Sequence, residues 1–204
     1  MKAFKASAIT IKKAAKIVED GGVVVYPTDT VYGLGCNPFN EDALGRVFRI
    51  KGERTKPLPI LASDVKAVER IAHTTDKALK LAEKFWPGPL TMVLPKKASL
   101  PSIVTHNLDS VATRVPNYKV ALKLIRMSGG LLVGTSANKT GKKPPQTAAE
   151  AAKQIGREVD LIIDDGPTPI GASSTIIDLT QEELKILRRG PIRLEDILSL
   201  QKVL

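Results

Sequence analysis

The sequence predicts a single α/β domain over residues 1–204, in which a twisted sheet of mixed parallel and antiparallel strands is flanked by helices. Two observations predict this class. Short β-branched apolar runs alternate with segments of helical periodicity along most of the chain, and most connections between them are short. The last apolar runs, at 161–164, 175–179 and 184–187, have no helix between them, so we expect these late strands to supply the antiparallel part of the sheet.

The first half of the chain carries two helices with recognisable start signals. Thr10 is placed to cap a helix whose apolar positions recur at helical spacing, and Gly21-Gly22 ends it. Asn40 caps a second helix over residues 40–50. The other elements expected here are the strand 23–26, the basic loop 51–56, the strand 58–62, a helix from Ser63 to residue 72, a helix that includes residues 78–85 and the strand 90–94.

The second half begins with a long loop and then returns to the same alternation. Residues 96–110 lack periodicity and are rich in Ser, Pro and Asn, which is typical of a loop. Further along, Thr147 and Glu150 have the spacing of a capping box and predict the start of a helix. The remaining elements expected in this half are the strand 111–115, the helix 119–127, the strand 131–135, the polar segment 136–146, the three late strands and a closing helix at 194–200.

The composition is that of an ordinary globular protein. Hydrophobic residues make up 43% of the chain and charged residues 25%, which is too apolar for intrinsic disorder. No apolar run approaches the about 18 residues that a membrane-spanning helix needs, and residues 1–16 lack the apolar block of a signal peptide. We therefore expect a cytoplasmic protein with no membrane partner.

Positive charge is in excess, with 31 Lys and Arg against 21 Asp and Glu and a net charge of +10. This invites a nucleic-acid or polyphosphate partner, but lysines on solvated helix faces explain it equally well, so charge alone leaves both interpretations open. The single cysteine, Cys36, excludes an intramolecular disulfide and a cysteine-based zinc site. The two histidines, His73 and His106, are too few to build a zinc site by themselves.

Polar, unusual segments follow several of the expected strands. In α/β folds ligands bind in the loops beyond the strand ends. We therefore expect these segments to converge on one crevice and form a pocket. The five segments are 27–35, 51–56, 113–118, 136–146 and 166–174.

Two of these segments carry groups suited to anionic or small polar ligands. The bend Tyr26–Gly33 holds hydroxyls and a carboxylate, which either bond their own backbone in a structural turn or bind a small polar substrate. Lys51, Arg54 and Lys56 follow a helix, where they either stabilise its C-terminal dipole or neutralise a carboxylate or a polyphosphate. The residues alone leave these alternatives open.

The stretch from Gly134 to Lys143 resembles a phosphate-binding loop but fails its spacing. A Walker A loop has four residues between its glycine and the Gly-Lys pair, whereas six residues separate Gly134 from Gly141 here. Pro144-Pro145 also delays the following helix. We therefore reject a P-loop, and retain a Thr-Ser-Ala-Asn segment after a strand whose hydroxyls and amide can bind a nucleotide or an amino acid.

Arg114 lies within a predicted strand beside apolar residues. If it is buried, it needs an anionic partner, and no acidic residue is near it in the sequence. No Ser/His/Asp set is evident, because neither histidine accompanies a nucleophile-bearing elbow. Covalent catalysis by a serine is therefore not expected.

Taken together, these segments resemble the threonylcarbamoyl-AMP synthase family, which has a YrdC-like domain and fold. The similarity runs over nearly the whole chain and is specific because seven short motifs occur in the family's order. The motifs are Tyr26–Gly35, Ile50-Lys51-Gly52 before Lys56–Pro59, Trp86–Thr91, Arg114–Pro116, Thr135–Asn138, Ser174–Asp178 and Leu187–Gly190.

The resemblance implies a nucleotidyltransferase that condenses L-threonine, bicarbonate and ATP into threonylcarbamoyl-AMP and pyrophosphate. Downstream transfer proteins would then use the product for N6-threonylcarbamoyladenosine modification of tRNA. Mg²⁺ would be held mainly by ATP phosphates and water, so no dedicated metal ligand is expected. Cations and oriented hydroxyls suffice for such chemistry through positioning and electrostatic stabilisation.

The resemblance also implies roles for individual residues. Lys51 and Arg54 would be the catalytic basic pair. The residues expected to bind threonine are Thr30, Arg114, Ser136 and Ser174. The residues expected to bind ATP are Lys51, Arg54, Asn138 and Arg188.

The sequence departs from the family pattern in two places. The family's arginine stands two positions after its lysine, where this chain has Glu53, and we expect a local shift that lets Arg54 take the role. Leu61 stands where some members carry a histidine. The chain also ends before the second domain of longer members, so it resembles the short, single-domain form.

A second hypothesis belongs to a different class: a noncatalytic protein that binds tRNA or double-stranded RNA in the same basic cavity. Aromatic residues make up only 4% of the chain, and no aromatic pair lies on a predicted strand. Stacking platforms for bases are therefore missing, which favours a small-molecule pocket.

The expected shift of the arginine can be tested by paired substitutions. Arg54→Ala should remove most of the activity, because it deletes a cation that faces the anionic substrates, whereas Glu53→Ala should remove little. Pyrophosphate release under identical conditions measures both. The reverse ranking would show that the arginine is wrongly aligned.

Overall fold

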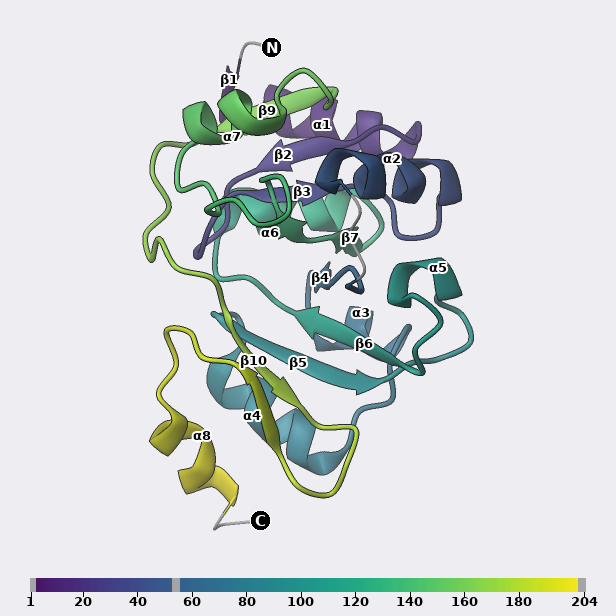
Figure 1. Cartoon of the computed structure of the whole chain (residues 1–204), viewed down its shortest axis with the longest axis vertical. Coiled ribbons are helices and arrows are strands. Elements are labelled where there is room, and N and C mark those ends of the chain that lie inside the picture. Colours follow the sequence, from purple (N-terminus) through teal and green to yellow (C-terminus); the bar gives the residue numbers. More distant parts are fainter. Residues whose placement is uncertain (1–2, 53–55, 202–204) are drawn as a thin grey trace.

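The computed structural model describes residues 3–52 and 56–201 and has an α/β architecture in which two sheets are flanked by helices (Figure 1). The strands are β1 (Phe4–Lys5), β2 (Val24–Tyr26), β3 (Gly33–Gly35), β4 (Ile60–Ala62), β5 (Leu90–Pro95), β6 (Ser110–Arg114), β7 (Leu131–Val133), β8 (Thr135–Ser136), β9 (Leu161–Asp164), β10 (Thr175–Asp178) and β11 (Lys185–Arg188). The helices are α1 (Ala8–Glu19), α2 (Glu41–Lys51), α3 (Val65–Glu69), α4 (Asp76–Phe85), α5 (Ser102–Thr105), α6 (Lys119–Met127), α7 (Ala148–Ile155) and α8 (Leu194–Gln201).

Both sheets mix parallel and antiparallel pairs, which confirms the predicted fold class, although the strands form two sheets rather than one. The five-stranded sheet has the order β1-β9-β2-β3-β8, and the six-stranded sheet has the order β11-β10-β5-β6-β4-β7. In Figure 1 the five-stranded sheet lies toward the N-terminus, and β5, β6 and β10 lie in the other half with α4 beside them. The cavity described below is lined by strands of both sheets.

The late strands are only partly antiparallel, contrary to expectation. β10 pairs antiparallel with β11, but it also pairs parallel with β5. β9 pairs parallel with both β1 and β2. The antiparallel pairs β2–β3 and β5–β6 come instead from strands earlier in the chain. Local spacing could not reveal the parallel pairs of β9 and β10, because these strands lie far from their partners in sequence.

Two helix starts differ from the predicted caps. α1 begins at Ala8, because the Ser7 hydroxyl accepts a hydrogen bond from the Thr10 amide, while the Thr10 hydroxyl donates to the Lys5 carbonyl. α3 is capped by Asp64 rather than Ser63, since the Asp64 carboxylate accepts from the Ala67 amide and Ser63 donates to that carboxylate. Hydrogen bonding to the amide lowers the pKa of Asp64.

Several short elements were not predicted. α5 lies in the segment 96–110 that was expected to be a loop, and β3 lies in the glycine-rich bend 33–35. The strand expected at 131–135 is divided into β7 and β8 by Gly134. Glycine and single turns of helix carry weak propensity signals, so tertiary pairing decides these elements.

Gly134 is the point at which one extended run passes from one sheet to the other. β7 pairs with β4 in the six-stranded sheet, and β8 pairs with β3 in the five-stranded sheet. A Cβ atom at Gly134 would lie 2.3 Å from Cγ of Leu61, so only glycine fits against this neighbour. The Gly134 amide donates to the Pro59 carbonyl at 2.8 Å, which fixes the crossing.

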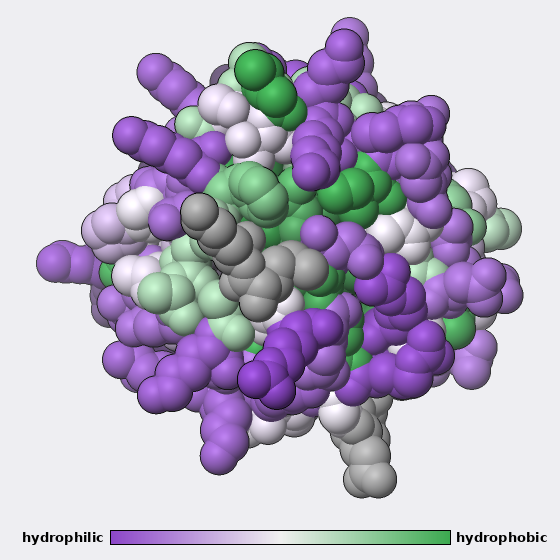
Figure 2. Space-filling view, turned by 90° about the horizontal axis from the view of Figure 1, so that it is seen from above, coloured by the Kyte–Doolittle hydropathy of each residue, from purple (hydrophilic) through white to green (hydrophobic). Residues whose placement is uncertain are grey.

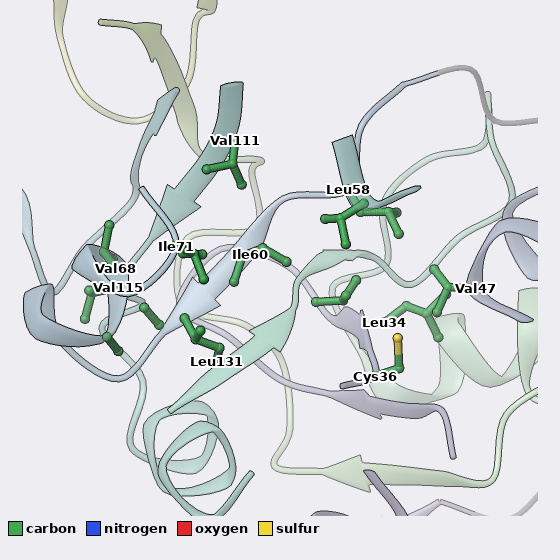
Figure 3. Packing of buried hydrophobic residues seen from close by; sticks show 14 of the residues in the cluster. Leu34, Cys36, Val47, Leu58, Ile60, Val68, Ile71, Val111, Val115 and Leu131 are labelled. Atoms are coloured by element: carbon green, nitrogen blue, oxygen red, sulfur yellow. The ribbon is translucent and has the colours of Figure 1, made fainter. Parts of the chain in front are cut away.

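The core contains two clusters of buried apolar residues, one on each side of the five-stranded sheet. One cluster joins α1 and α6 to β2 and β9, and the other extends from α2 through β3 and β4 to β5 and α4. Figure 3 shows part of the larger cluster, with Leu34, Cys36 and Val47 together and Ile60 between Leu58 and Leu131. Cys36 is a packing residue of this cluster, because its side chain is fully buried.

Trp86 anchors the turn before β5. Its ring nitrogen donates to the Leu90 carbonyl at 2.6 Å, and the ring belongs to the larger core cluster.

The face seen from above in Figure 2 is hydrophilic over most of its periphery, with hydrophobic surface across its middle. No helix within residues 3–52 and 56–201 is long and apolar enough to cross a membrane.

Gly134→Ala should destabilise the fold, because the added methyl group overlaps Leu61 in a packed interior. We expect a loss of about 1–3 kcal/mol in the free energy of unfolding, measured by urea denaturation. The double variant Gly134→Ala/Leu61→Ala should lose less than the sum of the two single losses, since it removes the overlap.

Gly45→Ala is the matched control. Gly45 lies inside α2 with only an ordinary contact to Arg49, so alanine should stabilise the helix by about 0.5–1 kcal/mol. A Gly134→Ala protein as stable as wild type would contradict the close approach described here.

Candidate active site

A cavity of about 550 Å³ is lined by residues from both sheets. All five polar segments identified in the sequence contribute to it, so the predicted convergence is confirmed. The lining residues are Thr28, Thr30, Val31, Tyr32, Gly33, Lys56, Pro57, Pro59, Leu61, Thr91, Val93, Leu108, Ser110, Ala112, Arg114, Gly134, Thr135, Ser136, Ser173, Ser174, Ile176, Asp178, Leu187 and Arg188.

One wall of the cavity is a face of the six-stranded sheet. Alternate residues of a strand point to opposite faces, so Thr91 and Val93 of β5 line the cavity while Met92 packs in the core. Ala112 and Arg114 of β6 line the same wall. This wall is therefore apolar around Val93 and Ala112, and polar where Thr91 and Arg114 lie.

Arg114 is buried in this wall and has the anionic partner that its burial requires. Its Nη2 donates to Oδ1 of Asp29, which precedes it by 85 residues, and both side chains are 6% exposed. Its Nε donates to the Gly88 carbonyl at 3.0 Å and its Nη1 to the Thr30 hydroxyl at 2.8 Å. Burial lowers the pKa of Arg114, and the Asp29 carboxylate opposes this, so the ion pair keeps the guanidinium charged.

The hydroxyls of the bend 28–31 form a directed chain. Thr28 donates to the Val31 carbonyl at 2.7 Å and accepts from the Thr30 amide. The contact of 3.0 Å between the Thr28 and Thr30 hydroxyls is then donated by Thr30, because the Thr28 proton is already used. The Thr30 oxygen accepts from Arg114 and keeps one lone pair. The bend is thus both a structural turn and a cavity wall that offers an acceptor.

Ser174 and Arg188 both line the cavity and are joined by two hydrogen bonds. Arg188 donates from Nε to the Ser174 carbonyl at 2.9 Å and from Nη2 to the Ser174 hydroxyl at 3.0 Å. The Ser174 hydroxyl also contacts the Thr91 hydroxyl at 2.8 Å. These bonds orient one edge of the Arg188 guanidinium and fix the position of the serine oxygen.

Arg188 keeps its positive charge for a ligand. Within residues 3–52 and 56–201, no carboxylate lies within ion-pair distance of it. Burial of part of the guanidinium and the charge of Arg114 both lower the pKa of Arg188. The unpaired charge of Arg188 therefore favours an anionic ligand in the cavity.

Lys51 and Asn138 do not line the cavity, although the family resemblance assigns them to ATP. Lys51 is the last residue of α2 and is 2% exposed. Its ammonium group donates to the carbonyls of Ser136 at 2.7 Å and Asn138 at 2.6 Å, and to Oδ1 of Asn138 at 3.2 Å. The Asn138 amide donates to the carbonyls of Lys139 and Lys142. In this structure both side chains hold the segment that follows β8.

The other expected site residues that the structure describes line the cavity. Thr30, Arg114, Ser136 and Ser174, which were expected to bind threonine, all line the cavity, as does Arg188. Lys56 lines it and is exposed. Arg54 and Glu53 lie outside the described residues.

Two residues of the site were not singled out from the sequence. Asp29 was noted only as part of a polar bend, and Thr91 only as the end of the Trp86–Thr91 motif. The available signal for Asp29 was the need of a buried arginine for an anion, but the sequence could not say which carboxylate supplies it. Thr91 was detectable only through its strand register beside β10.

The chain matches a known protein family over most of its length. The model of the Sua5/YciO/YrdC family, described as telomere recombination, matches residues 16–190. The chain therefore belongs to this family. It is 42% identical over 189 residues to the threonylcarbamoyl-AMP synthase of Pyrococcus abyssi, covering 92% of this chain and 56% of that protein.

A second curated relative gives the same result. The threonylcarbamoyl-AMP synthase of Bacillus subtilis is 38% identical over 190 residues, which cover 92% of this chain and 55% of that protein. The chain thus spans about half the length of each of these two relatives.

Solved structures agree with the fold. The crystal structure of P. abyssi Sua5 complexed with L-threonine matches with a TM-score of 0.95 at 39% identity, covering 98% of this chain and 61% of that one. The crystal structure of E. coli YciO matches with a TM-score of 0.87 at 25% identity, covering 96% of this chain and 98% of that one.

The buried pair of the site makes a stability prediction that is independent of function. Arg114→Met should cost about 3–5 kcal/mol in the free energy of unfolding, because it leaves the Asp29 carboxylate buried without a counter-charge. The double variant Asp29→Leu/Arg114→Met should recover most of this loss, since neither charge remains. Chemical denaturation of wild type, Arg114→Met, Asp29→Leu and the double variant gives the coupling energy.

Arg46→Met is the matched control, because it breaks the Arg46–Asp160 pair, whose side chains are 34% and 36% exposed. Its cost should be about 1 kcal/mol or less. Equal losses for Arg46→Met and Arg114→Met would contradict the burial described for Asp29.

Proposed function

We propose that this protein is an L-threonylcarbamoyladenylate synthase, a nucleotidyltransferase that converts L-threonine, bicarbonate and ATP into threonylcarbamoyl-AMP and pyrophosphate. The names of the P. abyssi and B. subtilis relatives support the proposal, as does the likeness to P. abyssi Sua5 complexed with L-threonine. The observation that carries it is one cavity that holds two guanidinium groups, Arg114 and Arg188, together with oriented hydroxyls.

The reaction suits a site without a covalent nucleophile. The threonine nitrogen bonds to the carbon of bicarbonate with loss of water, and the resulting carbamate oxygen bonds to the α-phosphorus of ATP as pyrophosphate leaves. The substrates bring a carboxylate, a carbamate and a triphosphate together. Bringing these negative groups together raises the activation free energy of the reaction. Fixed cations and hydroxyls lower it by holding the groups in line and stabilising the charge of the transition state.

The amino acid would bind at the Arg114 side of the cavity. Three guanidinium N–H groups are used by Asp29, Thr30 and Gly88, which leaves two for a carboxylate. The remaining lone pair of Thr30 would accept a hydrogen bond from the amino group or the hydroxyl of threonine. Ser136 and Ser174 line the same cavity and would complete the contacts.

ATP would bind at the Arg188 side, where the guanidinium has no carboxylate partner among the described residues. Lys56 would add a second cation to the phosphates. Lys51, Asn138 and Arg54 are assigned to ATP by the family resemblance alone. For Lys51 and Asn138 this requires their contacts with the segment after β8 to change when ATP binds.

Mg²⁺ would enter with ATP and supply positive charge to the triphosphate. Among the cavity-lining residues that the structure describes, Asp178 is the one acidic side chain, and its Oδ1 already accepts from the amide and hydroxyl of Thr180. One nearby carboxylate fits an ion held mainly by phosphate oxygens and water. We therefore assign no further protein ligand to the metal.

We further propose that the product serves tRNA N6-threonylcarbamoyladenosine formation through separate transfer proteins in the cytoplasm. A direct complex with tRNA belongs to the same proposal, supported by the +10 net charge. The net charge suits the noncatalytic RNA-binding hypothesis equally well, but no other observation favours that hypothesis, which becomes an outcome of the activity test.

The activity is tested by pyrophosphate release from ATP with the purified protein and Mg²⁺. Release should require both L-threonine and bicarbonate, because the nucleophile forms from the two. Omission of either one is the control for background hydrolysis of ATP. Release that is independent of either substrate, or no release together with tight binding of duplex RNA, would refute the assignment.

A further inference from the structure

Asp29 is the one buried carboxylate among the described residues that touches the cavity wall without lining the cavity. It is 4% exposed and lies behind Arg114 and Thr30, which do line it. Its Oδ1 accepts from Arg114. Its Oδ2 is buried and has no hydrogen-bond partner in the described part of the chain. Among residues 3–52 and 56–201, the charge of Asp29 is therefore balanced by Arg114 alone.

This arrangement changes what Arg114 offers to a ligand. A guanidinium that faces the cavity by itself is a full positive charge and attracts the most highly charged anion present. With Asp29 behind it, the pair has no net charge, and its field toward the cavity is that of a dipole. The two free N–H groups remain as directional donors that fit a carboxylate.

Arg188 in the same cavity is the contrasting case. It donates to a carbonyl and a hydroxyl of Ser174, which are neutral acceptors, so its charge is not balanced by any residue that the structure describes. The cavity thus contains one neutralised and one free guanidinium. A phosphate group gains more from the free one, whereas a zwitterionic amino acid avoids repulsion of its ammonium group at the neutralised one.

We propose that Asp29 is a positioning and charge-balancing residue that makes the Arg114 subsite selective for an amino-acid carboxylate over a phosphate group. It acts through Arg114, whose guanidinium it holds in one orientation together with Thr30 and Gly88. The inference rests on the proposed function, because it assigns the amino acid to this side of the cavity. Asp29 would thereby keep ATP, phosphate and pyrophosphate out of the subsite of the amino acid.

The test is the ratio of the affinities for L-threonine and inorganic phosphate, measured by titration calorimetry on the whole chain. Asp29→Asn keeps the size of the side chain and an oxygen acceptor but removes the charge. We expect phosphate to bind more tightly and the threonine-to-phosphate affinity ratio to fall by about tenfold or more. A purely structural role would weaken both ligands and leave phosphate binding without a gain.

Two variants serve as matched controls. Asp29→Glu keeps the charge, so its phosphate affinity should stay at the wild-type value. Asp160→Asn removes the same type of side chain from an arginine pair that is not at the cavity, so both affinities should stay unchanged. A ratio for Asp29→Asn within about twofold of wild type, or the same gain in phosphate binding for Asp160→Asn, would overturn the proposal.

If Asp29→Asn yields no folded protein, Arg114→Lys decides. Lysine keeps a point charge but lacks the planar fork, so threonine affinity should fall by about tenfold while phosphate affinity is retained. Unchanged threonine affinity would then overturn the proposal. Wild-type protein that binds no L-threonine would refute the proposed function, whereas the phosphate measurements would still decide the role of Asp29.

Discussion

The ion pair between Asp29 and Arg114 is the constraint on which the cavity depends. Asp29 follows β2 of the five-stranded sheet, and Arg114 is the last residue of β6 in the six-stranded sheet. The pair therefore ties the two sheets at the base of the cavity, and Arg114 also binds the carbonyl of Gly88 before β5. Because both side chains are buried, neither can leave the other without exposing an unpaired charge to an apolar interior.

The same pair organises the charges around it. The bend 28–31 takes its shape from hydroxyls that bond its own backbone, and Arg114 adds a donor to that chain. Across the cavity, Ser174 orients Arg188 through two hydrogen bonds without neutralising it. The excess positive charge of the chain is thus of two kinds. One part lies in the cavity, and another lies on exposed lysines such as Lys12 and Lys80, where it is solvated.

The sequence predicted the fold class and most elements, because strands and helices with strong periodicity are decided locally. Helix α6 was predicted at its observed bounds, whereas β3, at 33–35, was missed because glycines carry no strand propensity. The division into two sheets was also missed, since it depends on pairing between distant strands. For the site, the expected convergence is observed, because Thr30, Arg114, Ser174 and Arg188 line one cavity.

The limits of prediction at the site have the same physical cause. The partner of Arg114 lies 85 residues away, and nothing in the spacing distinguishes Asp29 from other acidic residues. The position of Lys51 was also not foreseen. It ends α2 rather than starting a basic loop, and its ammonium group binds backbone carbonyls of the segment after β8. A charge count in a loop cannot show whether a lysine faces a ligand or the backbone.

The crossing of the chain from one sheet to the other at Gly134 also limits how the two sheets can move relative to each other. β7 and β8 are adjacent in the chain but belong to different sheets, and the buried Tyr26 hydroxyl donates to the carbonyl of Val133 between them. The sheets therefore cannot hinge apart as two rigid bodies without breaking hydrogen bonds in both. Widening of the cavity at its base would be a partial unfolding event, with the slow rate and high free energy of such an opening. A ligand of the cavity must instead enter and leave through the rim, where the lining residues Lys56, Leu108 and Leu187 are exposed.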